Sequence, residues 1–334
     1  MAPSRTPRSV TRAASWRWAR SFFGPTATAQ PESARAATQL GFVLAKQGKL
    51  PEAVLSYRRA LALDPGSAEV HAYLGSALAS QAQWDEAVTH FEQALKARPQ
   101  KAELHDWLGV ALREKGRPEE ALSHFREAVR LEPGLAIAHY NLGRALKQQG
   151  QLDEAVRHYR RALAIDKHLA AAHNSLGSVL GSQGKLGEAA SHFREALGIE
   201  PDNAEAHNNL GLVLRMMGKR DEAIAQFRAA LSGRPDWPGP MSEIAWILAT
   251  HPDPKRRDPA QAVRLAERAA ELTGRREPAV LDALAAAYAA AADWERATAT
   301  AETAIALAGP QSRAQADDIA RRRALYLNRQ PYRE

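Results

Sequence analysis

The chain contains no cysteine, so it can hold neither a disulfide framework nor a thiolate metal site. It also lacks any run approaching the roughly 18 apolar residues that a membrane-spanning helix requires. Motifs of common enzymatic chemistry are missing as well: no glycine-rich phosphate loop, no G-x-S-x-G elbow and no H-E-x-x-H pair occurs. We therefore expect no enzymatic activity, no cofactor and no metal site.

The net charge of +7 is concentrated at the two ends of the chain. Residues 1–33 hold five arginines and one glutamate, and residues 312–334 hold six arginines and three acidic residues. The stretch between them carries no net charge. A nucleic-acid-binding protein needs its basic stripe on the folded surface. We therefore expect a protein or peptide ligand and no nucleic acid, with the oligomeric state left open.

Residues 1–33 combine Pro, Ser, Thr and Arg with four large aromatic residues and have no periodic apolar face. Such a composition does not offset the entropy of ordering, which predicts a disordered basic arm. Two alternatives stay open. The arginines and the Ala27-Thr28-Ala29 sequence fit an export signal, while the aromatic residues with arginines fit a membrane-surface anchor. Without either function for the arm, we expect the protein in the cytoplasm.

What the chain does contain is one 34-residue pattern that recurs six times over residues 34–237. Every repeat has Leu at position 7, Gly at position 8, Glu at position 19 and Ala at positions 20 and 27. Position 24 is always aromatic, and position 32 is proline in five of the six repeats. In the third repeat, the glycine and the aromatic residue are Gly109 and Phe125.

The spacing of these positions predicts two helices in each repeat. Positions 4, 7, 8 and 11 form one apolar stripe, and positions 20, 24, 27 and 28 form a second. Glycine at position 15 is suited to a left-handed cap of the first helix, and proline at position 32 ends the second. Small residues at positions 8 and 20 allow the two helices to cross closely, and the aromatic at position 24 fills the space between neighbouring repeats.

This pattern resembles the tetratricopeptide repeat, whose period is also 34 residues. The resemblance implies an all-α fold, a right-handed α-solenoid superhelix of about eight helix hairpins followed by a C-terminal capping helix. It departs from the family at position 4, where Ala or His replaces Trp, and at position 11, where Leu replaces Tyr. The closing Tyr326-Leu327 and Pro331-Tyr332-Arg333 look like the terminal segment of many bacterial members.

The array continues beyond the six regular repeats in a less regular form. Residues 238–277 fit a divergent repeat with a loop inserted within His251–Pro259, and residues 278–311 fit an eighth repeat. Residues 312–334 are expected to form a capping helix and tail, with Ile319, Leu325 and Leu327 covering the last hairpin. Repeat arrays need such a cap because an end repeat exposes its stacking face.

The resemblance implies that the first helices line a concave groove, so that the function is that of a non-enzymatic scaffold binding an extended peptide or a partner helix. Amides can bond a peptide backbone, and cations favour acidic groups. The groove residues expected from the repeat positions are Tyr73, Trp107, Arg113, Tyr140, Asn141, Arg144, Lys147, Asn174, Asn208, Asn209 and Arg215.

Two subfamilies of the tetratricopeptide repeats were compared by register. The carboxylate clamp of chaperone-binding members is absent when the register starts at the fourth repeat. The asparagine ladder of protein O-linked sugar transferases is matched by Asn141 and Asn209 but interrupted by Ser175. The alternative function is therefore a recruiting or targeting subunit for a separately encoded transferase, or for export or assembly machinery.

Histidine recurs at position 4 of five repeats, which suggests a metal ladder at first sight. Neighbouring packed helices lie about 8–10 Å apart, whereas zinc–nitrogen bonds measure about 2.0–2.1 Å. We therefore expect these histidines to take part in packing or local hydrogen bonding. They are His71, His105, His139, His173 and His207.

Overall fold

The computed structural model describes residues 33–308 and 312–334 of the chain. Within these ranges it contains helices and no β-strand, which confirms the all-α fold expected from the repeats. The arm expected at residues 1–33 lies outside the described part except for Ser33, whose hydroxyl caps the first described helix by accepting from Ala36 N–H. No described helix is both long and apolar enough to cross a bilayer.

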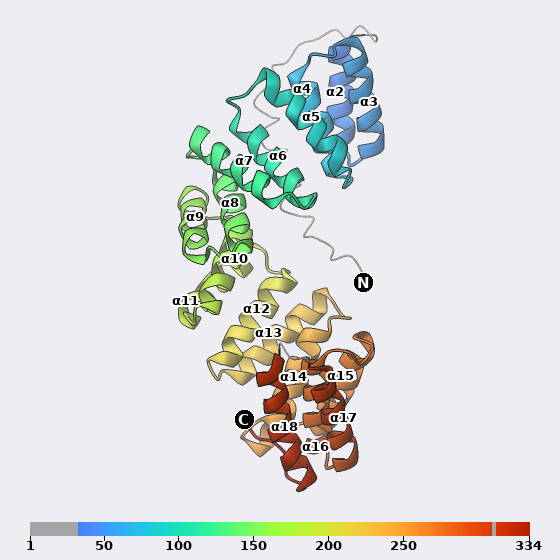
Figure 1. The fold of residues 1–334 in the computed structure, drawn as a ribbon, viewed down its shortest axis with the longest axis vertical. Coiled ribbons are helices and arrows are strands. Elements are labelled where there is room, and N and C mark those ends of the chain that lie inside the picture. The colour runs from blue at the N-terminus through green and yellow to red at the C-terminus, as the bar shows by residue number, and fades with distance from the viewer. Residues whose placement is uncertain (1–32, 309–311) are drawn as a thin grey trace. The chain divides into compact units, whose positions relative to one another are not determined.

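The helices follow one another as antiparallel pairs joined by short turns (Figure 1). The first members of the pairs are α2 (Ala34–Lys46), α4 (Ala68–Ala79), α6 (Ala102–Glu114), α8 (Ala136–Gln148), α10 (Ala170–Ser182), α12 (Ala204–Met216), α14 (Pro238–Thr250) and α16 (Pro278–Ala290). The second members are α3 (Leu50–Leu63), α5 (Trp84–Ala97), α7 (Pro118–Leu131), α9 (Leu152–Ile165), α11 (Leu186–Ile199), α13 (Arg220–Gly233), α15 (Pro259–Leu272) and α17 (Trp294–Leu307). A further helix, α18 (Arg313–Leu327), follows the last pair.

The turn inside each pair has the left-handed backbone conformation expected at position 15. Gly48 and Gly116 adopt φ values of +78° and +77°, and the glycines at this position in the fourth to sixth repeats are similar. Glycine reaches this region without the steric penalty of a Cβ atom. In the second repeat Ala82 takes the same conformation with φ +59°. The hairpin geometry therefore imposes the turn even where the sequence offers no glycine.

The glycine at position 8 lies directly against the aromatic ring of its own repeat. A Cβ atom built on Gly109 would lie 2.7 Å from Cε1 of Phe125, a ring that is fully buried. Gly41 and Tyr57 have the same relation, and Tyr57 also stacks on Tyr73 of the next repeat with ring centroids 5.8 Å apart. The ring thus fills space within its own hairpin as well as between repeats, which extends the expectation from sequence.

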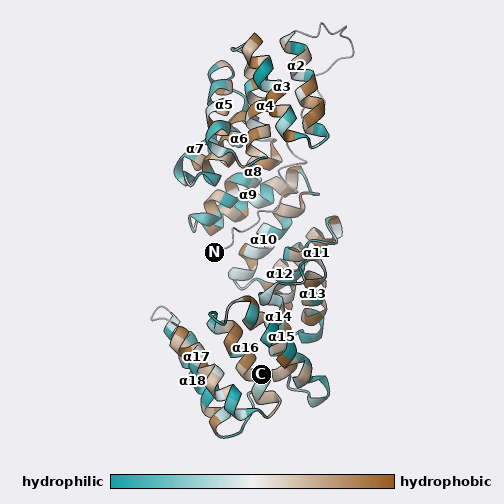
Figure 2. Ribbon diagram, turned by 90° about the vertical axis from the view of Figure 1, so that its right-hand side faces the viewer, coloured by the Kyte–Doolittle hydropathy of each residue, from teal (hydrophilic) through white to brown (hydrophobic). Residues whose placement is uncertain are grey.

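The irregular end of the array keeps the paired arrangement. The inserted loop joins α14 to α15 at residues 251–258 and contains a 3₁₀ turn, η2 (Pro254–Arg256). Hydrophobic residues are prominent along α16 (Figure 2), where every residue from Val280 to Ala289 is buried. These apolar surfaces hold the last hairpins together although alanine replaces the aromatic residue at position 24 of the eighth repeat.

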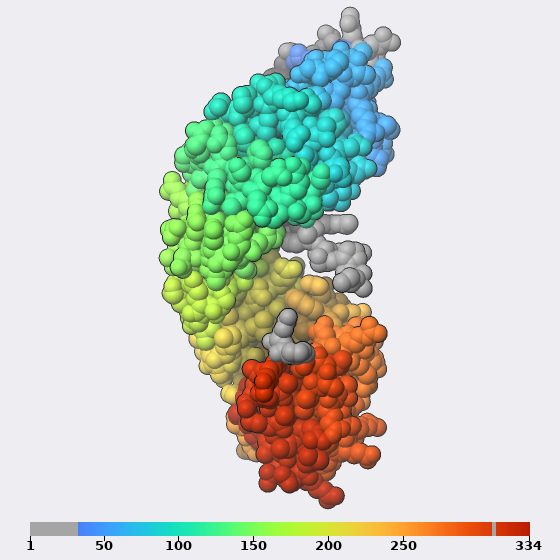
Figure 3. All heavy atoms as spheres, viewed as in Figure 1, coloured from blue at the N-terminus to red at the C-terminus, as the bar shows by residue number. Residues whose placement is uncertain are grey.

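The helix α18 packs against α17 and contributes to the surface of this end of the chain (Figure 3). Its buried side chains are Ile319 and Tyr326. The expectation for Leu327 was wrong, since this side chain is 57% exposed. One residue corresponds to a rotation of about 100° around a helix, so the neighbouring Tyr326 takes the inward position.

The chain divides into two compact units, one ending at Val179 and the other covering Leu180–Glu334. The boundary falls inside α10, one turn before its end. We call these the N-terminal unit and the C-terminal unit, and describe the candidate sites of each separately.

Candidate functional site

The expected groove residues all lie on first helices of the pairs, where positions 5, 6, 9 and 12 of the repeat share one face. Those in the N-terminal unit lie on α4, α6, α8 and the first part of α10, and those in the C-terminal unit lie on α12. Within the N-terminal unit, α6 contacts both α4 and α8. This neighbour relation gives a surface formed by successive first helices.

The aromatic side chains predicted to line this surface are mostly buried beneath it. Tyr73 and Tyr140 are only 5% and 7% exposed, so little of either side chain faces solvent, and their role in binding stays a prediction. The physical reason is the ring at position 24, because Tyr73 packs on Tyr57 and Tyr140 lies 6.1 Å from Tyr159. Trp107 is half-buried and packs against the core cluster of Ala72, Ala94 and Leu104.

A buried carboxylate–amide pair joins α6 to α8 beneath the surface. The Asn141 amide donates to both carboxylate oxygens of Asp106 at 2.9 and 3.1 Å, and both residues are at least nine-tenths buried. Burial raises the pKa of Asp106 to about 6, against the opposing effect of the Asn141 hydrogen bonds. The Asn141 Nδ2 group is therefore engaged by Asp106, and a role of Asn141 in peptide binding stays a prediction.

Arg113 lies near this pair, Arg144 lies near Arg113, and Lys147 lies near Arg144. The Arg113 side chain is 7% exposed, and its Nε and Nη2 groups donate to Glu114 at 3.3 and 2.9 Å. Its Nη1 group is buried and has no hydrogen-bond partner. Burial, and secondarily the positive charge of Arg144, lower the pKa of Arg113. An unpaired buried donor on a cation is costly unless an acceptor reaches it.

The other two cations extend the surface along α8. The Arg144 guanidinium lies over the Tyr140 ring, with Cζ 5.7 Å from the ring centroid. Lys147 is exposed, and its Nζ donates to the Ser178 hydroxyl of α10 at 3.0 Å. Arg113 therefore lies on α6, Arg144 and Lys147 lie on α8, and the Lys147 contact joins α8 to α10. We call these three residues with Trp107 the α6–α8 surface.

The remaining expected residues differ in their surroundings. Asn174 on α10 and Asn208 and Asn209 on α12 are half-buried on first helices, and their role in binding stays a prediction. Arg215 on α12 is engaged by acidic side chains of its own chain. Its Nε lies 2.8 Å from Glu243, and its Nη1 lies 3.6 Å from Glu334 in the C-terminal tail.

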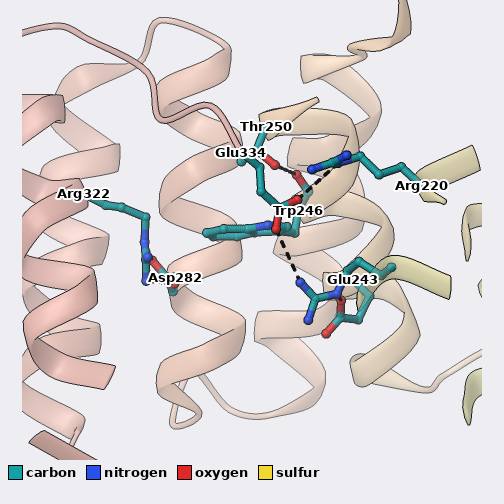
Figure 4. A network of polar contacts seen from close by, with 8 residues as sticks. Arg220, Glu243, Trp246, Thr250, Asp282, Arg322 and Glu334 are labelled. Atoms are coloured by element: carbon teal, nitrogen blue, oxygen red, sulfur yellow. Dashed lines mark hydrogen bonds and ion pairs between the residues drawn. The ribbon is translucent and has the colours of Figure 1, made fainter. Parts of the chain in front are cut away.

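The tail that reaches Arg215 is a feature that the sequence analysis missed. Residues 331–334 return along α14, so that Tyr332 lies beside Trp246 with ring centroids 5.7 Å apart. Figure 4 shows Trp246 and Glu334 in this part of the chain. The Glu334 carboxylate also lies 3.4 Å from Arg220 Nε. The sequence signals were the closing Pro-Tyr-Arg segment and Trp246 at position 9 of the divergent repeat. Both belong to the terminal segment that resembles bacterial members of the family, but no periodic pattern indicated that they would be in contact.

The recurring histidines form pairs within their repeats. His71 and His90, His105 and His124, and His139 and His158 lie with their Nδ1 atoms 2.9, 3.0 and 2.9 Å apart. The Nε2 atom of the first member lies 3.0–3.2 Å from a backbone carbonyl six residues earlier. Local hydrogen bonding is therefore confirmed as their role. Among the described residues no three or more metal-ligand side chains gather.

Comparison with protein-family models identifies the repeat directly. A model described as "Tetratricopeptide repeat" matches residues 66–132, 100–168, 134–202 and 168–236, and a second, described as "TPR repeat", matches residues 41–82. No curated protein sequence matches this chain closely enough to suggest a function.

Solved structures of similar fold include a Pseudomonas aeruginosa pilF structure, with 22% identity and a TM-score of 0.56, matching 62% of this chain and 94% of that one. PilW, titled a type IV pilus biogenesis factor, has 23% identity and a TM-score of 0.57, matching 64% of this chain and 98% of that one. The Cut9–Hcn1 structure of the APC/C has 16% identity and a TM-score of 0.61, matching 89% of this chain and 57% of that one. At these identities the likeness concerns the fold alone.

Proposed function

Since the chain belongs to the tetratricopeptide repeat family, we propose that it is a non-enzymatic interaction scaffold whose α6–α8 surface binds an extended acidic segment of a partner protein. Trp107 supplies apolar contact area, and Arg113, Arg144 and Lys147 bind carboxylates. Helical repeat arrays present extended surfaces of this kind to their ligands.

The observation that carries the proposal is the buried Nη1 group of Arg113. It is a charged donor without an acceptor, on a side chain only 7% exposed. A carboxylate that reached it would form a charge-assisted hydrogen bond, which is about twice as strong as a neutral one. The same anion would reduce the repulsion between Arg113 and Arg144 that contributes to the lowered pKa of Arg113. Ligand binding would thus relieve two unfavourable features of the free protein.

The arrangement of the cations favours an elongated ligand over a compact anion. Arg113 lies on α6, Arg144 and Lys147 lie on α8, and Lys147 reaches Ser178 on α10. A segment that crosses these helices can place successive acidic side chains near successive cations, whereas a single small anion would contact only part of the set. Exposed Lys147 would act mainly through long-range attraction, which salt screens.

The alternative is a recruiting or targeting subunit for a transferase or for export or assembly machinery, and its transferase form would be favoured by an asparagine ladder at position 6. One of its two asparagines, Asn141, has its amide bonded to buried Asp106, and Ser175 interrupts the series. The ladder therefore gives the transferase form of this alternative little support, and the acidic-segment proposal is the one we develop.

Reversing one charge tests the α6–α8 surface. We expect Arg144→Glu to weaken the binding of a fluorescein-labelled, glutamate-rich heptapeptide by about tenfold or more, because the new carboxylate repels the ligand as well as removing a cation. Fluorescence anisotropy with the full chain gives the dissociation constant. We also expect the affinity of the unmodified chain to fall as ionic strength rises.

The matched control is Arg130→Glu on α7, which reverses an exposed arginine that pairs with Glu127 on a second helix. This variant has the same net charge as Arg144→Glu. A difference in peptide affinity between the two variants therefore reports the position of the charge and not the total charge. Equal affinities of both variants for the peptide, with both proteins folded by circular dichroism, would contradict the proposal.

A further inference from the structure

The C-terminal tail lies on the first-helix face of the C-terminal unit, as a bound peptide would lie on a neighbouring repeat. The tail contacts α14 at two positions of the repeat. Tyr332 lies beside Trp246 at position 9, and the Glu334 N–H donates to the Thr250 carbonyl oxygen at position 13 at 3.1 Å. Arg333 Nη1 donates to Ala249 O at 2.9 Å. Figure 4 shows Glu334 between Arg220 and the end of α14.

The surface under the tail offers three kinds of recognition. The last carbonyls of a helix have no partner inside the helix, so those of α14 accept hydrogen bonds from an incoming chain. The Trp246 ring offers an aromatic platform, with the Arg322 guanidinium 5.2 Å from its centroid. Arg215 and Arg220 offer positive charge to an acidic side chain.

The side chains that form this surface are held more firmly than the tail that lies on it. Arg322 of α18 is held by a two-pronged contact with Asp282 of α16, with donor–acceptor distances of 3.0 and 2.6 Å, and both side chains are largely buried. The tail residues are less enclosed. Tyr332 and Arg333 are half-buried, the Glu334 side chain is 27% exposed, and the ion pairs of Glu334 are long at 3.4 and 3.6 Å.

We propose that the surface formed by Arg215, Arg220, Trp246 and the C-terminal end of α14 is a second peptide-binding site, occupied in this structure by the chain's own tail. Its ligand is a segment with an aromatic residue followed two positions later by an acidic residue, the chemistry that Tyr332 and Glu334 display. A partner segment of this kind binds by displacing the tail. The inference goes beyond the proposed function, because every residue involved lies in the C-terminal unit.

The loose hold on the tail explains why it can act as a replaceable occupant. The ion pairs of Glu334 are long and partly solvated, so each contributes little to stability. The covalent connection keeps the tail at an effective concentration in the millimolar range. The tail therefore occupies the site when no ligand is present and competes with a free peptide of similar intrinsic affinity. Weakening the tail's own contacts should open the site without changing the surface beneath.

The test uses the full chain carrying Tyr332→Ala and Glu334→Lys, and a fluorescein-labelled peptide with the sequence of residues 328–334, Asn-Arg-Gln-Pro-Tyr-Arg-Glu. We expect this variant to bind the peptide at least about tenfold more tightly than the unmodified chain, because its tail no longer competes. A peptide with alanine in place of its Tyr and Glu should not bind. Adding Arg220→Glu to the variant should abolish binding.

Absence of peptide binding to the folded variant would overturn the proposal, and so would equal binding to both chains that Arg220→Glu leaves unchanged. If the double variant fails to fold, Glu334→Lys alone changes only one side chain at the end of the tail and is tested with the same peptide and the same two outcomes. Arg144→Glu, which tests the α6–α8 surface, is expected to leave binding of this peptide unchanged. The two proposals can therefore fail independently.

Discussion

Replacing Gly109 with leucine is expected to lower the free energy of unfolding by about 3 kcal/mol. A Cβ atom at this position would already lie 2.7 Å from Cε1 and 2.8 Å from Cδ1 of Phe125. The ring cannot move away easily because Phe125 is fully buried, and a close-packed interior leaves no void to receive it. The remaining leucine atoms would force α6 and α7 apart. Urea-induced unfolding followed by circular dichroism measures the loss.

The chain contains its own control for this substitution. Gly198 lies within α11, and a Cβ atom built on it meets nothing within 4 Å. Gly198→Leu makes the same chemical change in an open helical position, where leucine improves helix propensity by about 0.5–1 kcal/mol. We expect Gly198→Leu to be neutral or stabilising. A Gly109→Leu protein as stable as the Gly198→Leu protein would show that the glycine–aromatic contact does not limit the hairpin.

Removing the charge of buried Asp106 is expected to change how stability depends on pH. The folded-state pKa of Asp106 is raised to about 6 by burial, above the value of about 3.9 for an unfolded chain. A group with a raised folded pKa contributes stability that is fully present below the unfolded pKa and is lost as pH rises through the folded pKa. Asp106 therefore stabilises the fold at acidic pH and loses that contribution between about pH 4 and pH 6.

The comparison that isolates this effect is the free energy of unfolding of the unmodified chain minus that of Asp106→Asn. We expect the difference to rise by about 2–3 kcal/mol when the pH falls from about 7 to about 4. Subtracting the variant cancels the titration of other groups, including the histidine pairs. A difference that stays constant with pH, or rises with increasing pH, would show that burial does not raise the pKa of Asp106 in the folded protein.

Most of the fold was predictable because the same local sequence pattern recurs in six repeats. Residues such as Gly109 and Phe125 are constrained by a contact inside one hairpin, and the sequence spacing alone brings them onto facing helices. The left-handed Ala82 was not predictable from residue type, since alanine does not favour positive φ. It follows from the geometry of the hairpin, which dominates the local preference.

The candidate site was less predictable because it depends on contacts between repeats. The repeat positions located Arg113 and Arg144 on neighbouring first helices, but not the depth of each side chain. Tyr140 was expected to be exposed and is buried by the Tyr159 ring. The contact between Asp106 and Asn141 joins residues 35 positions apart. Tail contacts such as Arg333 with Ala249 span 84 positions, and no periodic pattern encodes them.

The central claim is that partners bind the first-helix surface of the N-terminal unit, and site-specific photo-crosslinking tests it most directly. A photoreactive phenylalanine analogue replaces Trp107 on α6 in one chain and exposed Arg126 on α7 in another, each expressed in the native host. We predict a discrete crosslinked protein with an acidic segment at the Trp107 position, lost when Arg144→Glu is added, and none at the Arg126 position. Crosslinks at Arg126 with none at Trp107, from two folded chains, would contradict the account.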